Sequence, residues 1–252
     1  LGLNKPLPQQ YVSYVTGLVK GDLGTSLRTK RPVLTEVQGR YMNTVQLTLL
    51  SLTWSVIAGV LIGVWSGRNR SKWQDYTGMT VAVSGISMPS FWIGFMLIMV
   101  FAVKYRLLPT TGAGSFKNLI LPSITLGVSI AAIIARFTRS SVIEVMKEDY
   151  VRTARAKGLR EKTVIWKHVF RNCMISVVTV VGLQFGFLLG GSVVTETVFA
   201  FPGLGSLLIE SVNYRDYPAI QSLILIFSLH FVLINLVVDV LYAVLNPEIQ
   251  LS

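Results

Sequence analysis

Five stretches of the chain carry no charged residue over 18 positions or more. They lie between Arg40 and Arg68, Asp75 and Lys104, Lys117 and Arg136, Arg171 and Glu196, and Asp216 and Asp239. Each stretch is rich in apolar side chains, and an α-helix needs about 20 such residues to cross a hydrocarbon core of about 30 Å. The pattern therefore predicts five membrane-spanning helices, over residues about 45–66, 78–103, 118–135, 174–195 and 218–238.

The same stretches decide the fold class. A membrane β-barrel would show short segments in which apolar and polar residues alternate, whereas these stretches are continuously apolar. The composition agrees, because 52% of the residues are hydrophobic and only 14% are charged, against about 25% charged in an ordinary soluble domain. We therefore expect an all-α membrane protein that forms a single domain over residues 1–252.

Reactive side chains are scarce. Cys173 is the single cysteine, so no disulfide can form within the chain, and His168 and His230 are too few for a multi-histidine metal cluster. The sequence also lacks the usual phosphate-binding, zinc-peptidase and serine-hydrolase signatures. We expect no catalytic residue, no metal site and no cofactor in this chain.

The formal net charge of +11 is informative only by position. The basic residues lie between the apolar stretches, so they indicate orientation in a membrane rather than binding to nucleic acid. Residues 136–171 hold ten basic and four acidic side chains, and because Lys and Arg resist translocation we place this segment in the cytoplasm. Alternation then puts residues 68–75 and the C-terminus in the cytoplasm, and residues 1–40, 104–117 and 196–216 outside.

The orientation has a consequence for the N-terminal side. Thirteen basic residues then lie inside and ten outside, which is a modest bias. Five spans and a cytoplasmic C-terminus leave Leu1 outside the cell. We therefore predict one further span upstream of Leu1.

The cytoplasmic segment 136–171 has the pattern of two helices. Ser141 and Glu144 form an S-x-x-E capping box, an apolar side chain recurs every four residues, and Gly158 is placed to end the first helix. The apolar stripe is made of Val142, Met146, Tyr150 and Ala154. Such an amphipathic helix suits either an anionic lipid surface or a groove of a protein partner. The four acidic residues of the segment favour the protein.

Several strings of residues resemble one family of bacterial transporters. EDYVRTARAKG (148–158), KHVFRN (167–172) and VVTVVGLQFGFLLGG (177–191) resemble the cytoplasmic EAA loop and following helix of ABC-importer permeases. KGDLGTSL (20–27), LPSITLG (121–127), VFAFPGLGSLLIESVNYRDYP (198–218) and LVVDVLYAVLNPEI (236–249) resemble the branch that imports dipeptides, oligopeptides, nickel and glutathione. The resemblance covers essentially all 252 residues.

This resemblance implies a type I ABC importer fold with six spans, in a bacterial inner membrane. It implies four partners: a second homologous permease, two cytoplasmic ATPases that bind ATP and Mg²⁺, and an extracytoplasmic solute-binding protein. The implied substrate is a dipeptide, an oligopeptide or glutathione, with nickel or a metal–chelator complex as the alternative. The short segment 104–117 is more similar to the glutathione and nickel members. A gradient-driven secondary transporter is a distant alternative, because mid-span ionisable groups are almost absent.

The resemblance also implies which residues contact the ATPase. The matching positions are Glu148, Asp149, Tyr150, Thr153, Ala154, Ala156, Lys157 and Gly158. Two positions depart from the general pattern. Arg152 stands where the EAA consensus has an acidic residue, which is normal for the peptide branch, and Ser176 stands where a proline is common.

Two spans carry glycines four residues apart, a spacing that allows helices to approach closely in lipid. These ridges are Gly59, Gly63 and Gly67, and Gly182, Gly186 and Gly190. We expect packing seams within one subunit, with an interface to the second permease as the alternative for the second ridge. Gln184, Ser192 and Thr195 lie on the opposite side of that helix, where they would line the translocation pathway or bond a neighbouring helix.

Three further features concern the shape of the spans. His230 lies in the middle of the last span without the partners that a proton relay needs, so we assign it no chemistry. Pro89 and Pro122 should kink or break their helices. The Phe201–Gly205 turn should lead into a short re-entrant or interfacial helix.

Overall fold

The computed structural model describes residues 6–245, apart from the side chains of residues 175–176, 189–191, 239 and 241–245. Its helical elements are α1 (Leu7–Val19), α2 (Val33–Arg68), α3 (Trp73–Ser87), α4 (Ser90–Leu97), the π-helical η1 (Ile98–Lys104), α5 (Phe116–Val145), α6 (Asp149–Ala156), α7 (Glu161–Thr163), the π-helical η2 (Val164–Val169), α8 (Phe170–Val198), α9 (Leu204–Asn213) and α10 (Tyr217–Leu245). Within the described residues the β-pairing is limited to a single isolated bridge between Thr25 and Pro32, so the all-α prediction is confirmed.

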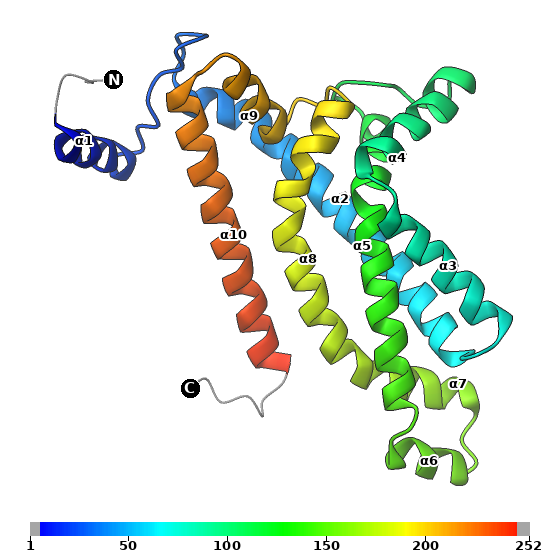
Figure 1. The fold of residues 1–252 in the computed structure, drawn as a ribbon. Coiled ribbons are helices and arrows are strands. Elements are labelled where there is room, and N and C mark those ends of the chain that lie inside the picture. The colour runs from blue at the N-terminus through cyan, green and yellow to red at the C-terminus, as the bar shows by residue number, and fades with distance from the viewer. Residues whose placement is uncertain (1–5, 246–252) are drawn as a thin grey trace.

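The long helices form a bundle with short helices at both ends (Figure 1). α2 packs along α5, and α8 packs between α5 and α10. One end of the bundle holds α6 and α7, and we call it the α6 end. The other holds α9 and the start of α10, and we call it the α9 end.

Each of the five predicted spans falls on a helix or a helix pair. Among the described residues, α2, α5 and residues Tyr217–Val238 of α10 are each long and apolar enough to cross a membrane. Two pairs of helices joined at a bend raise that number to five if each pair is one span. The chain is therefore a multi-pass membrane protein by both its pattern and its structure.

The segment predicted as one span over 78–103 is not one straight helix. α3 ends at Ser87, Met88 is extended with φ −93° and ψ 131°, and α4 begins after Pro89. The two parts are bent by 103°. Proline lacks the N–H of the helical ladder and disfavours helical backbone in the residue before it, which explains the break at Pro89. Pro122 instead lies inside α5, which continues past it.

The first glycine ridge forms the seam between α2 and α5. A Cβ added at Gly59 would lie 2.7 Å from the carbonyl oxygen of Ala131, and one at Gly63 would lie 2.6 Å from that of Ala135. At Gly67 it would lie 2.8 Å from Cγ1 of Val142. Backbone oxygens cannot move aside as a side chain can, so Gly59 and Gly63 require glycine for the two helices to pack this closely. At Gly67 the closest contact is with the Val142 side chain.

Replacing Gly63 with leucine should separate α2 from α5 and destabilise the protein by about 1–3 kcal/mol or more, the cost of overpacking a filled interface. Gly39 on the same helix has no atom within 4 Å of an added Cβ, so Gly39→Ala is the matched control. We expect the control to keep or raise the thermal unfolding midpoint of the purified protein, because alanine favours a helix by about 1 kcal/mol over glycine. Equal midpoints for Gly63→Leu and wild type would contradict the seam.

The second ridge lies against α10. An added Cβ at Gly182 would collide with the side chain of Val238, and one at Gly186 would lie 3.0 Å from Cε2 of Phe231. In this structure both glycines are therefore part of a seam within one chain. The surroundings of Gly190 lie outside the described residues.

The predicted two-helix pattern of residues 136–171 needs correction. No helix begins at the Ser141–Glu144 capping box, because α5 runs on to Val145 and Ser141 is buried within it. The stripe of Val142, Met146, Tyr150 and Ala154 is consequently divided between two helices. A turn over residues 146–148 ends α5 and redirects the chain into α6. Packing of α5 on α2 through Val142 and Gly67 outweighs the local capping signal.

Candidate functional site

At the α6 end, α6 is a short helix held by one face. Glu148 is its N-cap residue, and Gly158 follows it with a φ of +74°, in the left-handed region that favours glycine. Val151 is fully buried and Ala154 is 5% exposed, in a cluster that includes Val164, Ile165 and Val169. The buried face of α6 therefore rests on the segment that leads into α8.

The opposite face of α6 is open. Of the eight residues that the resemblance assigned to ATPase contact, Ala154 is buried, and the seven others are exposed. The exposed ones are Glu148, Asp149, Tyr150, Thr153, Ala156, Lys157 and Gly158. The side chains of Asp149 and Arg152 are 94% and 81% exposed and carry opposite charges. The structure thus brings most of the predicted coupling residues together on one charged, accessible surface.

Two contacts fix α6 relative to the helices beside it. The Arg155 guanidinium donates to both carboxylate oxygens of Glu161, over 3.2 and 2.9 Å, and so closes the turn around Gly158. Asn172 Nδ2 donates to the Tyr150 hydroxyl oxygen over 2.9 Å. These bonds join α6 to α7 and to the first turn of α8, so a displacement of α6 would be transmitted to both helices.

A second ionic contact holds three helices together on the α6 side. Arg139 of α5 donates to both carboxylate oxygens of Asp75 at the start of α3, over 2.6 and 2.7 Å. The same carboxylate accepts from the Ser66 hydroxyl of α2 and from the Ser71 backbone N–H. Asp75 is 4% exposed, and such a bidentate, fully hydrogen-bonded pair is the geometry in which a buried ion pair is stabilising.

At the α9 end, the organising residue is Glu196 near the end of α8. Its side chain is fully buried. The Thr44 hydroxyl of α2 donates to Oε1 over 2.8 Å, and the Ser206 backbone N–H of α9 donates to Oε2 over 2.9 Å. The Glu196 carboxyl group therefore accepts from an N–H group at the N-terminus of α9 that has no partner within the helix.

The turn before α9 is shaped to admit this carboxylate. Thr44 Oγ1 also accepts from the Leu204 N–H over 2.8 Å, and Asn43 Nδ2 donates to the Pro202 carbonyl over 2.8 Å. A Cβ at Gly203 would overlap the Glu196 carboxyl group, and one at Gly205 would lie 2.9 Å from Oε2. The short helix predicted after the Phe201–Gly205 turn is therefore present as α9, and the turn is tied to both α2 and α8.

Asp216 fastens the segment before α2 to the start of α10. Its carboxylate accepts from the Ser26 hydroxyl and from the backbone N–H groups of Leu27 and Arg28, the Leu27 bond being 3.0 Å long. Burial alone would raise the pKa of Asp216, but the hydrogen bonds from Ser26, Leu27, Arg28 and Ala219 outweigh it and hold that pKa below the ordinary value.

This lowered pKa predicts a pH dependence. A carboxyl group whose pKa is lower in the folded state adds stability above its unfolded pKa, about 3.9 for aspartate, and loses it as the pH falls through the folded pKa. We expect the thermal unfolding midpoint to fall below about pH 4. Asp216→Asn should lower the midpoint at pH 7 and show a shallower acid decline. Parallel curves for the two proteins would contradict this role of Asp216.

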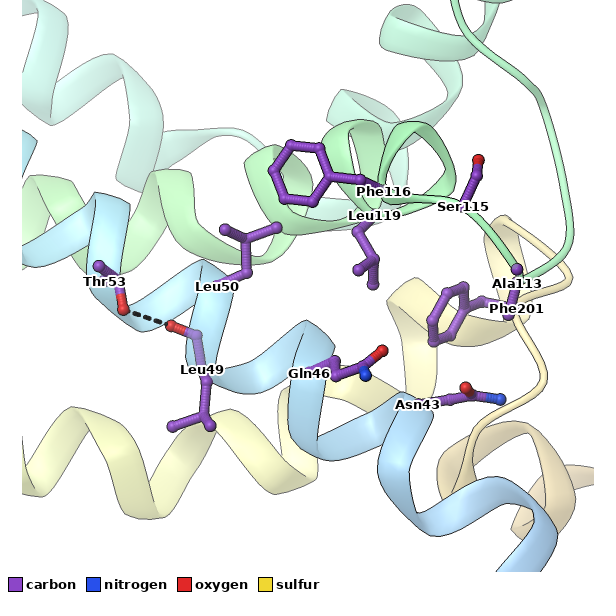
Figure 2. Close-up of a pocket in the computed structure, with 11 residues that line it drawn as sticks. Asn43, Gln46, Leu49, Leu50, Thr53, Ala113, Ser115, Phe116, Leu119 and Phe201 are labelled. Carbon is purple, nitrogen blue, oxygen red and sulfur yellow. Dashed lines mark hydrogen bonds between the residues drawn. The ribbon is translucent and has the colours of Figure 1, made fainter.

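Beside the α9 end of α2 lie two adjoining hollows, which we call together the α2 trough. One is a hollow of about 710 Å³ between α2, the start of α5 and Phe201 (Figure 2). In that view Asn43 and Gln46 lie on the side of α2 that faces the hollow, with Leu119 and Phe201 across from them. The other hollow, of about 600 Å³, shares Asn43, Ala113 and Gly114 with the first, and Arg31, Glu36 and Arg40 line it.

The predicted pathway residues of α8 do not share one environment. Ser192 is fully buried and Thr195 is 1% exposed, within four residues of Glu196, whereas Gln184 is half-buried. Sequence reasoning treated Glu196 and Asp216 only as the charges that bound an apolar stretch. The signal that could have found Glu196 was an acidic residue followed by the glycine-rich FPGLG turn.

No cluster of three or more His, Cys, Asp or Glu side chains that could hold a metal ion occurs among the described residues. His230 instead joins two helices. Its Nδ1–H donates to the Ile226 carbonyl over 2.8 Å, because a carbonyl can only accept, and the Tyr41 hydroxyl of α2 lies 2.6 Å from Nε2. Cys173 is fully buried in the core.

The backbone is similar to solved permease subunits of ABC transporters. It matches a chain of the inward-facing MetNI methionine ABC transporter with a TM-score of 0.72 and 18% identity, over 84% of this chain and 96% of that one. It also matches an amino acid ABC transporter crystallised with histidines, with a TM-score of 0.65 and 16% identity, over 82% of this chain and 92% of that one. The fold is that of the transmembrane subunit of a type I ABC importer.

The sequence identifies the family. Residues 59–251 match the binding-protein-dependent transport system inner membrane component. The chain is 55% identical over 250 residues to the glutathione transport system permease protein GsiC of Pectobacterium atrosepticum, covering 99% of this chain and 82% of that protein. The identity to GsiC of Escherichia coli K12 is also 55%, with the same coverage. The chain belongs to this family and is the transmembrane subunit of an ABC importer, a transport protein rather than an enzyme.

Proposed function

We propose that this chain is the permease subunit of a glutathione importer and forms half of the translocation pathway. The observation that carries the proposal is the 54–56% identity to GsiC proteins over 250 residues. The match covers 99% of this chain and so includes the α6 surface, the Glu196 turn and the α2 trough. A peptide of similar size is the substrate class that this likeness supports.

The proposal includes the partners and the orientation. A second homologous permease completes the pathway, a solute-binding protein delivers the substrate from outside, and two cytoplasmic ATPases bind ATP and Mg²⁺, so this chain needs no cofactor of its own. The α6 end and the C-terminus lie in the cytoplasm, and the α9 end lies outside. The ten basic residues of segment 136–171 support this orientation.

The mechanism we propose is alternating access. Closure of the ATPase dimer on ATP moves α6, and the two permeases rock between inward-open and outward-open states. The exposed surface of α6 and its bonds to α7 and α8 support this coupling role. Gln184 remains a proposed pathway residue. Ser192 and Thr195 would line the path only in a state in which α8 separates from its neighbours.

The test is ATP hydrolysis and uptake by the complete importer in nanodiscs and in proteoliposomes. Glutathione-loaded binding protein should stimulate hydrolysis and drive uptake of labelled glutathione. Binding protein loaded with a dipeptide or with a nickel chelate serves as the comparison. If only the binding protein loaded with nickel chelate stimulated hydrolysis, the substrate would be the nickel chelate and not glutathione. If none of the three loaded binding proteins led to ATP hydrolysis, the proposed function would be contradicted.

A further inference from the structure

The membrane helix α2 has two different faces along its α9-end half. One face is packed, and it carries the buried Thr44, Thr48 and Ser55. Asn43, Gln46 and Thr53 lie away from these, within about 80° of one another at 100° per residue, and all three line the first hollow. Polar side chains within a span usually face a cavity or another helix, because lipid offers them no hydrogen-bond partner. The Thr53 hydroxyl donates to the Leu49 carbonyl of its own helix and Asn43 donates to the Pro202 carbonyl, so the exposed amide of Gln46 is the main polar group available to a ligand in this hollow.

The trough continues from these polar residues to a charged mouth. Arg31, Glu36 and Arg40 line the second hollow, which shares Asn43 with the first. Arg40 bonds Glu210 over 3.2 Å, and the Thr29 hydroxyl donates to Glu36. Among the residues that the structure describes, the guanidinium of Arg31 takes part in none of the ion pairs. The mouth thus offers one uncommitted cation beside a carboxylate.

We propose that the α2 trough is the outer part of the translocation pathway and takes a small zwitterionic peptide that carries net negative charge. Arg31 receives a peptide carboxylate, Glu36 faces its ammonium group, and Asn43 and Gln46 exchange hydrogen bonds with its amides as it passes along α2. Arg binds carboxylates well because its planar group can donate two parallel bonds. This inference rests on the proposed function for the identity of the peptide.

The geometry favours a peptide route over a lipid groove. The hollows combine amide and hydroxyl groups with apolar walls from Leu119 and Phe201, as sites for small polar ligands do. A groove for acyl chains would need no amide groups in its wall. By contrast, the hollow between α8 and α10 is lined almost entirely by apolar side chains, and we assign it no substrate.

The first experiment measures water access in the complete importer. In a Cys173→Ser background, which removes the single cysteine, Gln46→Cys and Thr53→Cys are labelled with a membrane-impermeant methanethiosulfonate in nanodiscs. The matched control is Leu229→Cys, because Leu229 is 55% exposed on α10 but lies outside the trough. We expect labelling at both trough positions about tenfold faster than at the control, since a thiol reacts as thiolate only where water reaches it. Equal, slow labelling would overturn the inference.

The second experiment uses glutathione itself. Gln46→Leu should reduce glutathione uptake about fivefold, the loss of one hydrogen bond to the passing peptide, with binding-protein-stimulated ATP hydrolysis retained. Arg31→Gln should act in the same direction and Arg31→Lys should restore part of the uptake. Normal uptake by both Gln46→Leu and Arg31→Gln would overturn the inference and leave the proposed function intact, whereas loss of stimulation in the unmodified importer would contradict the proposed function.

Discussion

Replacing Ala154 with arginine is expected to abolish ATP-driven uptake while the protein still inserts into the membrane. Ala154 is 5% exposed between α6 and the segment that leads into α8. A guanidinium at this position must therefore either overpack the contact between them or displace α6 from that segment. A cost of about 3 kcal/mol lowers the equilibrium constant between the packed and the displaced positions of α6 by about 100-fold. The measurement is ATP-driven uptake normalised to the amount of importer in the membrane.

The matched control is Ala154→Ser, which nearly keeps the volume of the side chain and adds no charge. It should retain most of the uptake. A second variant, Gly158→Asn, keeps a residue that tolerates the φ of +74° at this position, whereas Gly158→Pro cannot adopt it. Uptake by Ala154→Arg at the wild-type rate would contradict the coupling role of α6.

Replacing Glu196 with leucine is the second change with a large expected effect. It leaves the Ser206 N–H without its acceptor and the Thr44 hydroxyl without its carboxylate partner, and an unsatisfied buried group costs about 1–3 kcal/mol. We expect α9 to detach from α2 and α8, with loss of transport and a lower unfolding midpoint. Hydrogen exchange of the amides over residues 203–207 in the purified importer should accelerate.

Glu196→Gln is the control, because it keeps the shape and one acceptor oxygen. Glu196→Gln should lose less stability than Glu196→Leu. Its rate of hydrogen exchange over residues 203–207 should lie between those of the wild type and of Glu196→Leu. The α6 end should be unaffected in both variants, so exchange over residues 149–156 reports whether the damage is local. Unchanged exchange over 203–207 in Glu196→Leu would show that the carboxylate does not hold the turn.

The positions of the spans followed from the sequence because charge is so strongly excluded from the hydrocarbon core. The glycine ridge of Gly59, Gly63 and Gly67 also followed, since only close helix approach explains that spacing in an apolar helix. The direction that the chain takes after Met88 could not be predicted from the sequence. A proline in a membrane helix sometimes breaks the helix, as Pro89 does, and sometimes leaves it continuous, as Pro122 does, and neighbouring helices decide which occurs.

The candidate site was only partly predictable. The resemblance singled out residues that the structure places on and next to α6, and their contact with an ATPase stays a prediction. The capping pattern at Ser141 was misleading because tertiary packing extended α5 through it. Glu196 and Thr44 are 152 positions apart in the chain, so their bond is set by how α2 and α8 cross. No local pattern reports such a crossing, and the α2 trough depends on the same long-range arrangement of α2, α5 and Phe201.

The length of α5 has a mechanical consequence. Its 30 residues span about 45 Å at about 1.5 Å per residue, from Phe116 at the wall of the α2 trough to Val145 just before α6. The glycine seam and the Asp75–Arg139 contact bind the half of α5 nearest α6 to α2 and α3. In the proposed mechanism, a displacement of α6 would therefore move α5 as one stiff helix, together with the parts of α2 and α3 that are bound to it. The α6 end and the α9 end of this subunit would then change position together during transport.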